Sequence, residues 1–212
     1  MRLQTSTTTT CHSTMSRKLK KIFIHTTKAL VAVCLLQVFA ACNDVQNEFT
    51  LSPCFLIIDN DIHQDAILAS AMNPNAPGLF CTIRRINAAG ADKFHFESSD
   101  GQTSEKSLNG VDKQRRMIIG YNNGLIVGFG NLSTPSTFYA YDRECPNCFD
   151  PNYIPVRSKP LRVSTTGIAT CNLCKRQYDL NNGGNIIKGD GGKKMTRYRA
   201  STTGPLGRLV VN

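Results

Sequence analysis

Tryptophan is absent from this 212-residue chain, and aromatic residues make up only 8% of it. Long stretches with a helical period are also lacking, and no segment repeats at a fixed spacing. These absences argue against helical bundles, coiled coils and repeat solenoids. Hydrophobic residues nevertheless make up 41% of the chain, which is too many for a chain disordered throughout. The length fits one ordinary domain with an extension, or two small domains.

Residues that would support catalysis are not arranged in any known pattern. Of the four histidines, only His63 and His95 follow the first 42 residues. Neither lies in a motif with the spacing of metal ligands, so we expect a loop position for His63 and a strand position for His95. The sequence contains no Ser-His-Asp set, phosphate-binding loop or pair of catalytic carboxylates. We therefore predict that the protein is not an enzyme.

The net charge of +10 is unevenly distributed along the chain. Residues 1–42 contain no Asp or Glu, but they hold six of the 25 Lys and Arg residues. The remaining basic residues are scattered and do not form a stripe with interleaved aromatic side chains, as a nucleic-acid-binding surface would. We therefore predict that nucleic acid is not a partner.

The N-terminal segment has the features of an export signal. Residues 17–28 are basic, and residues 29–41 (ALVAVCLLQVFAA) are apolar. This apolar run is too short to cross a bilayer comfortably, but it suits the hydrophobic part of a signal peptide. Ala40 and Ala41 then precede Cys42. This ending resembles the lipobox of bacterial lipoproteins, in which the cysteine receives lipid and becomes the new N-terminus.

The lipobox resemblance implies that residues 1–42 are a signal peptide ending at a lipidated Cys42, followed by a tether at 43–50. Met15 is an alternative start, since a signal peptide counted from there has ordinary proportions. A membrane anchor that is never cut, or a buried helix, would be the alternatives for this segment. The expected location is the cell envelope, where the lipid holds the protein to a membrane on the non-cytoplasmic side.

The chain after the tether predicts mostly short strands. Residues 64–72 could form two helical turns, because Asn73-Pro74 ends them. The Asn-Gly pair at 123–124 predicts a hairpin between strands at 116–119 and 125–129. The other predicted strands lie at 54–59, 79–86, 93–97, 137–141, 161–163, 168–170, 185–188, 195–200 and 208–211. Short strands separated by Gly, Pro and Asn turns indicate an all-β sandwich or a partly open barrel.

Four cysteines form two Cys-x-x-Cys motifs. Cys145 and Cys148 make the first, Cys171 and Cys174 make the second, and 22 residues lie between the motifs. Each motif follows a predicted strand, and two such tight turns facing each other would give a tetrahedral cage of four sulfurs. The alternatives are two disulfides or two redox-active dithiols. Dithiols are disfavoured, because neither motif is followed by the helix that a thioredoxin-like site needs.

Residues 137–212 resemble a Rieske-type iron–sulfur domain. The sequence FYAYDRECPNC gives a strand and a first ligand loop, and ATCNLCKRQYDLNNGG gives a second loop, an aromatic residue and a glycine turn. The closing strands follow in KKMTRYRA and RLVVN. This resemblance implies a Rieske-like β-sandwich over residues 51–212, a metal-binding part at about 142–184, a 2Fe–2S cluster and electron transfer.

The ligand set departs from the Rieske pattern. A Rieske cluster has two Cys ligands on one iron and two His ligands on the other, but here Cys148 and Cys174 occupy the histidine positions. We therefore expect the metal-binding tip of the sandwich to resemble that of rubredoxin or of a zinc ribbon. Two symmetric motifs favour a single tetrahedral ion, zinc or iron, whereas the family resemblance implies 2Fe–2S. The sequence leaves both open.

Two function classes remain open. In the first, the protein is a small electron carrier that docks to a redox partner in the envelope. In the second, it is a lipid-anchored interaction or binding module whose Cys₄ zinc is purely structural. Cys54 and Cys81 lie in apolar, strand-like runs, which predicts buried free thiols. A disulfide between them is the alternative for an exported protein.

Overall fold

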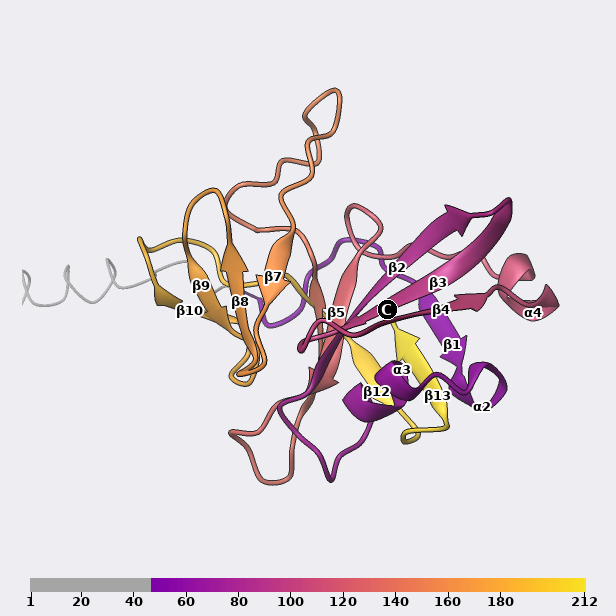
Figure 1. The fold of residues 1–212 in the computed structure, drawn as a ribbon. Coiled ribbons are helices and arrows are strands. Elements are labelled where there is room, and N and C mark those ends of the chain that lie inside the picture. Colours follow the sequence, from indigo (N-terminus) through magenta and orange to yellow (C-terminus); the bar gives the residue numbers. More distant parts are fainter. Residues whose placement is uncertain (1–46) are drawn as a thin grey trace, which may run out of the picture. The chain divides into compact units, whose positions relative to one another are not determined.

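Short strands form three antiparallel sheets in the computed structural model, which describes residues 47–212 (Figure 1). The predicted signal peptide, Cys42 and residues 43–46 of the tether lie outside the described residues. The three helices of the described part are short, namely α2 (Asn60–His63), α3 (Ala66–Ala71) and α4 (Gly110–Gln114). None of them is long and apolar enough to cross a membrane. The prediction of a mostly β-sheet protein is confirmed at this level.

The largest sheet has six strands. Their order across the sheet is β11 (Arg197–Tyr198), β6 (Phe138–Asp142), β5 (Leu125–Phe129), β2 (Phe80–Ala88), β3 (Ala91–Ser98) and β4 (Thr103–Ser107). Along β3 the side chains of Phe94 and Phe96 are fully buried, while their neighbours are partly exposed. This period of two is the pattern of a strand with one face on the core. It confirms the strand predicted at 93–97.

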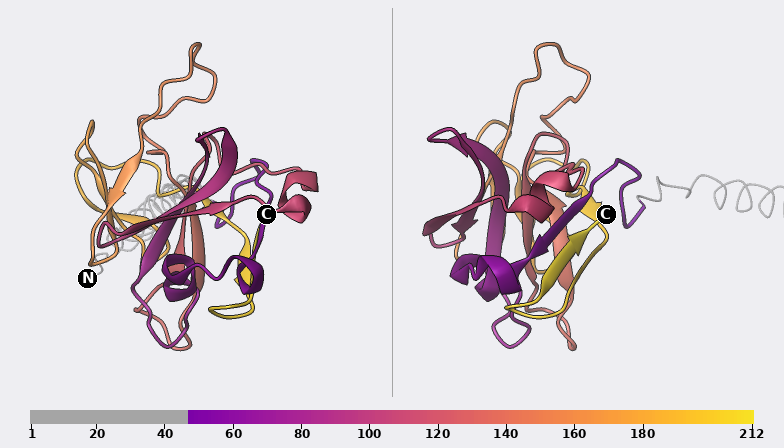
Figure 2. Two further views of the ribbon diagram at one scale, coloured as in Figure 1. Left: turned by 45° about the vertical axis from the view of Figure 1, so that its right-hand side comes forward. Right: turned by 90° about the vertical axis from the view of Figure 1, so that its right-hand side faces the viewer.

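A smaller sheet packs on one face of the six-stranded sheet. It consists of β1 (Leu56–Asp59), β13 (Arg208–Val211) and β12 (Ala200–Thr202), so the two ends of the described chain lie side by side (Figure 2). Leu56, Ile58 and Leu209 share a buried cluster with Phe94 and Phe96. The two sheets thus form a sandwich, which α3 extends with Leu68 and Met72.

The third sheet lies against the opposite face of the six-stranded sheet. It consists of β10 (Asn185–Lys188), β9 (Gln177–Asp179), β8 (Ile168–Cys171) and β7 (Leu161–Val163). Along β5, Leu125 and Val127 belong to the sandwich core, whereas Ile126 belongs to a second core. Successive side chains of a strand point to opposite faces, so both faces of β5 are covered here. Tyr139 and Tyr141 of β6 join Ile126 in this second core.

The predicted hairpin between 116–119 and 125–129 is wrong. Ile118 makes only an isolated bridge with Phe55, while β5 pairs with β2 and β6. Both edges of β5 are therefore occupied, one by β2 and the other by β6. Asn123 of the Asn-Gly pair nevertheless adopts the left-handed conformation expected for a turn, with φ of 55°. Its side chain bonds to both the N–H and the C=O of Arg85, which fixes the loop to β2.

Other elements differ in extent or were not predicted. β4 pairs with β3 but consists of polar residues, so the hydrophobic pattern misses it. The strand predicted at 195–200 divides at Arg199, since β11 pairs with β6 while β12 pairs with β13. The predicted helix at 64–72 is confirmed as α3, which begins after Asp65, whose side chain accepts a hydrogen bond from the N–H of Leu68 at 2.9 Å.

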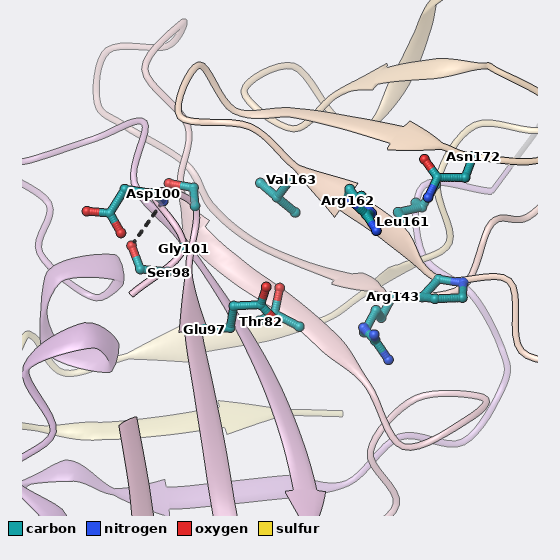
Figure 3. Close-up of a pocket in the computed structure, with 12 residues that line it drawn as sticks. Thr82, Glu97, Ser98, Asp100, Gly101, Arg143, Leu161, Arg162, Val163 and Asn172 are labelled. Carbon is teal, nitrogen blue, oxygen red and sulfur yellow. Dashed lines mark hydrogen bonds between the residues drawn. The ribbon is translucent and has the colours of Figure 1, made fainter. Parts of the chain in front are cut away.

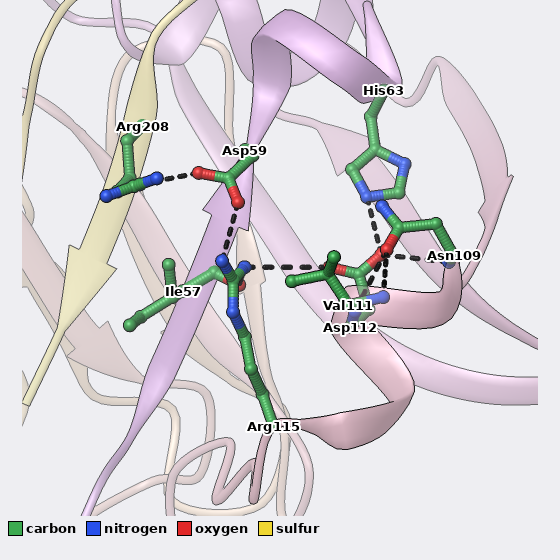
Figure 4. A network of polar contacts seen from close by, with 8 residues as sticks. All are labelled: Ile57, Asp59, His63, Asn109, Val111, Asp112, Arg115 and Arg208. Atoms are coloured by element: carbon green, nitrogen blue, oxygen red, sulfur yellow. Dashed lines mark hydrogen bonds and ion pairs between the residues drawn. The ribbon is translucent and has the colours of Figure 1, made fainter.

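A partly buried polar network joins β1, α2, α4 and β13 (Figure 4). Asp59 accepts hydrogen bonds from Arg208 and from Arg115, the latter at 2.7 Å. His63 Nε2 lies 2.9 Å from Asp112 Oδ2. His63 is therefore the buried last residue of α2 and not a loop residue, whereas His95 lies on β3 as expected. Each charged group of the network is held by partners from other elements.

We predict that Asp59→Asn lowers the free energy of unfolding at pH 7 by about 1 kcal/mol or more. Burial opposes ionisation of Asp59, but hydrogen bonds from Arg208 and Arg115 outweigh it and lower the pKa of the carboxyl group. A lowered pKa in the folded state adds stability above the unfolded pKa, about 3.9, and this stability is lost as the pH falls further. Urea unfolding between pH 7 and pH 2 should therefore show the two proteins converging. A difference in unfolding free energy between the two proteins that stays constant from pH 7 to pH 2 would contradict the prediction.

Candidate metal centre

The two Cys-x-x-Cys motifs meet beside the four-stranded sheet. The first follows β6, and the second forms the turn between β8 and β9. The Sγ atoms of Cys145, Cys148, Cys171 and Cys174 all lie within 4.8 Å of one another. All four are free thiols. The four residues predicted from the sequence are therefore brought together in an arrangement that could hold a metal ion.

Backbone hydrogen bonds shape both turns. The N–H groups of Cys148 and Phe149 donate to the carbonyl of Cys145 at 3.1 and 2.9 Å. In the second turn the N–H of Lys175 donates to the carbonyl of Cys171 at 3.0 Å. Lys175 itself adopts a left-handed conformation, with φ of 60°. Each turn thus folds its two cysteines onto the same side, towards the other motif.

The four thiols differ in exposure. Cys145 and Cys171 are buried in the second core, whereas Cys148 and Cys174 are only half-buried. The cage therefore has an inner pair of sulfurs, packed among side chains such as Tyr141, and an outer pair near the surface.

Tyr178 supports the inner sulfurs. Its hydroxyl oxygen lies 3.4 Å from Cys145 Sγ and accepts a hydrogen bond from Asn147 Nδ2 at 2.9 Å. Because the amide donates to the oxygen, the hydroxyl proton is free to point at the sulfur. Such a hydrogen bond stabilises negative charge on a thiolate, and it would orient Cys145 as a ligand.

Asn147 also fixes a third loop, residues 189–194. Its side chain donates to the carbonyl of Lys193 at 2.7 Å and accepts from the N–H of Lys193 at 2.9 Å. Arg176 holds the same loop by donating to the carbonyls of Asp190 and Gly191 at 2.9 and 3.0 Å. Gly192 is needed here, because a Cβ would lie 2.4 Å from the Asn147 Oδ1 atom. The loop is thus attached to both motifs.

The protonation of the thiols depends on their surroundings. Burial raises the pKa of Cys145, although the hydroxyl of Tyr178 opposes the shift, and burial also raises the pKa of Cys148. At Cys174 burial is outweighed by hydrogen bonds from the backbone and the guanidinium of Arg176, and the pKa falls to about 6. A bound cation would favour the thiolate form of all four residues.

The acidic residues before the first motif are structural. Glu144 is buried and accepts hydrogen bonds from Asn122, Ser158 and the N–H of Lys159, so it closes the base of the loop at 149–159. Asp142 accepts from the N–H of Tyr121 at 2.7 Å and from other donors. These roles of Glu144, Asp142, Asn147 and Arg176 were missed from the sequence, because their partners are distant in the chain.

Cys54 and Cys81 are both buried free thiols in the sandwich core, and the alternative of a disulfide between them is not formed. Burial raises the pKa of Cys54 to about 11 and raises that of Cys81 further. These thiols therefore stay protonated at neutral pH, as expected for residues that serve packing.

Comparisons with other proteins add nothing to this geometry. No protein-family model matches the chain, and no curated protein shows significant sequence similarity to it.

We predict that Cys145→Ser and Cys174→Ser each abolish stoichiometric metal binding and loosen residues 142–188. The reason is that the second core contains two of the four sulfurs, so loss of the metal also removes a link between β6 and the turn after β8. Metal content and amide hydrogen exchange should be measured on the same samples.

Cys54→Ala is the matched control for these variants, because Cys54 is a buried thiol in the other core. It should cost about 1–2 kcal/mol of stability through the cavity it leaves, without changing the metal content. Unchanged metal content and exchange in Cys145→Ser or Cys174→Ser would contradict the four-ligand assignment.

Proposed function

We propose that the four cysteines bind one tetrahedral metal ion. The Sγ atoms of Cys145 and Cys174 lie 3.8 Å apart, and those of Cys148 and Cys171 lie 3.9 Å apart. With metal–sulfur bonds of about 2.3 Å, the edge of a regular tetrahedron of sulfurs is about 3.8 Å. These spacings suit a single ion, and they are the observation that carries the proposal.

A two-iron cluster fits the distances less well. Such a cluster divides its four thiolates between two irons. In the Rieske pattern Cys145 and Cys171 would share one iron, and Cys148 and Cys174 would share the other. The two Sγ–Sγ distances of 3.8 and 3.9 Å instead each join a residue of one pair with a residue of the other. The 2Fe–2S cluster implied by family resemblance is therefore the second choice.

A Rieske-like scaffold is supported by the order of the elements around the site. The chain runs through β6, the first cysteine turn, the β7–β8 hairpin and the second cysteine turn. Tyr178 on β9 and the turn at 183–184 follow, and the chain then closes with β10 to β13. This is the order of elements in the Rieske-type domain that residues 137–212 resemble. The scaffold proposed here is a Rieske-like sandwich with a rubredoxin-like tip.

On this scaffold we propose one-electron transfer with a redox partner in the cell envelope. Two features support it: the outer sulfurs, Cys148 and Cys174, lie near the surface, and the Tyr178 hydroxyl and Arg176 lie beside Cys145 and Cys174. Hydrogen bonds to thiolates tune the reduction potential of an iron that they bind. An iron ion would accept and release the electron, while the outer sulfurs would bring it within reach of a partner.

A structural zinc ion is the second candidate function, and the burial of Cys145 and Cys171 favours it. Strands β7 to β10 have only three or four residues each, so their sheet has little backbone pairing to stabilise it. A tetrahedral ion would join the end of β6 to the β8–β9 turn and contribute folding free energy directly. The protein would then be a binding module without redox activity.

We further propose that the protein is a lipoprotein held to a membrane through Cys42. The support is the basic and apolar composition of residues 17–41 and the two alanines before the cysteine. The domain described here would then lie on the non-cytoplasmic side, separated from the lipid by the tether at 43–50.

The metal can be identified on the full chain, expressed under anaerobic reducing conditions and purified in detergent. We expect one iron per chain without acid-labile sulfide, and a visible absorption that bleaches on reduction. One zinc per chain and no colour would exclude the electron carrier and leave the structural module. Two irons with acid-labile sulfide would overturn the single-ion site. Absence of any metal would overturn the metal site itself, and a thiol titration would then show whether disulfides replace it.

The lipid anchor is tested by Cys42→Ser in the full chain. We expect the variant to lose metabolic labelling with a fatty acid, while its metal content stays unchanged, because the domain is separate from the leader. Cys34→Ser is the matched control, since it removes a thiol from the apolar run and leaves the lipobox-like ending intact. Equal labelling of Cys42→Ser and the unaltered chain would contradict lipidation at this residue.

A further inference from the structure

A polar cavity lies between the six-stranded and four-stranded sheets, next to the second cysteine turn (Figure 3). Thr82 and Glu97 line one side of it, while Arg162 of β7 and Asn172 of the turn line the other. Its volume is about 650 Å³, within the range of roughly 300–1,000 Å³ that is common for small-molecule sites. No function described so far uses this cavity.

Two arginines of the cavity, the half-buried Arg143 and the exposed Arg162, make no direct ion pair, although nearby carboxylates such as Glu97 act on Arg143 electrostatically. The side chains of Arg143 and Arg162 form no hydrogen bond or ion pair within residues 47–212. Arg143 is half-buried, and burial together with the like charge of Arg84 lowers the pKa of its guanidinium. The Nε atom of Arg84 is also buried without a hydrogen-bond partner. Partly desolvated positive charge of this kind would be stabilised by an anion.

Hydrogen-bonding groups without partners complete the cavity. Ser99 is 9% exposed, and its buried hydroxyl has no hydrogen-bond partner in the described structure. The Glu97 carboxylate likewise makes no hydrogen bond or ion pair there, although it is close enough to Arg143 to affect it electrostatically. Buried polar groups are normally paired, so the Ser99 hydroxyl indicates a missing polar partner, while the half-buried Glu97 offers a further acceptor beside it.

We propose that this cavity binds a small oxyanion that also carries several hydroxyl groups, of the sugar-acid or sugar-phosphate kind. The guanidinium groups of Arg143 and Arg162 match a carboxylate or phosphate, to which arginine can donate two parallel hydrogen bonds. Glu97 repels a simple anion but accepts hydrogen bonds from hydroxyl groups. Ser99 and Thr82 can exchange hydrogen bonds with further hydroxyl groups. The ligand therefore needs both an anionic end and a hydroxylated end.

The proposal can be tested by isothermal titration calorimetry on the metal-loaded full chain. Glucuronate and glucose 6-phosphate are the probes for the carboxylate and phosphate forms, while glucose and inorganic phosphate each supply only one half of the ligand. We expect at least one of the two complete probes to bind about tenfold or more tightly than either half. Comparison of the two complete probes then distinguishes the sugar acid from the sugar phosphate.

Arg143→Gln and Arg162→Gln should each weaken this binding by about tenfold or more, because each removes a charged donor. Arg157→Gln is the matched control, since Arg157 is exposed on the loop outside the cavity and should not affect binding. Arg162 is exposed on β7, so its variant tests the site even if Arg143→Gln disturbs folding. Metal content and circular dichroism would report such a disturbance.

Three results would overturn the proposal. The first is the absence of binding by both complete probes. The second is binding of inorganic phosphate alone as tightly as glucose 6-phosphate, because the hydroxyl groups would then have no role. The third is equal affinity of Arg162→Gln and Arg157→Gln, because binding would then lie outside the cavity.

Discussion

Burial of β5 on both faces is the constraint on which the arrangement of the molecule depends. Leu125 and Val127 face the sandwich core, and Ile126 faces the second core. The alternation of a strand forces these neighbours to opposite sides, so a second layer must cover the face that carries Ile126. The four-stranded sheet is that layer. Strand β6 shares the same double burial and leads directly into Cys145.

The candidate metal centre is therefore part of a core and not an addition to the surface. Cys145 and Cys171 pack with Tyr141, Tyr178 and Met195, while the outer thiols approach solvent. The Tyr178 hydroxyl lies beside Cys145, and Arg176, two residues earlier in the chain, lies beside Cys174. Asn147 donates both to Tyr178 and to the loop at 189–194, and Arg176 donates to the same loop, so the surroundings of the thiols and the closure of the loop share these two side chains.

The packing of the four-stranded sheet on the six-stranded sheet leaves part of the space between them empty. A cavity remains between the four-stranded sheet and strands β2 and β3, and Arg143 and Arg162 are among the residues that line it. The cavity borders the second cysteine turn through Asn172 but shares no cysteine with the cage. The two sites are thus neighbours that can be altered separately.

Local patterns predicted those features whose physical cause is local. The two-residue spacing in each cysteine motif sets a tight turn, and alternation at 93–97 sets a strand, so both could be read directly. The hairpin at 116–129 was wrong because the pairing of β5 is decided by competition among distant strands. The polar β4 was missed because its residues show no hydrophobic alternation, and the burial of His63 was missed because its partner Asp112 is remote in sequence. By itself the sequence determined the four candidate ligands and the strand-rich architecture. Only the tertiary structure decided how close the two motifs come, which thiols are exposed and which arginines remain unpaired, because these depend on packing between segments far apart in the chain.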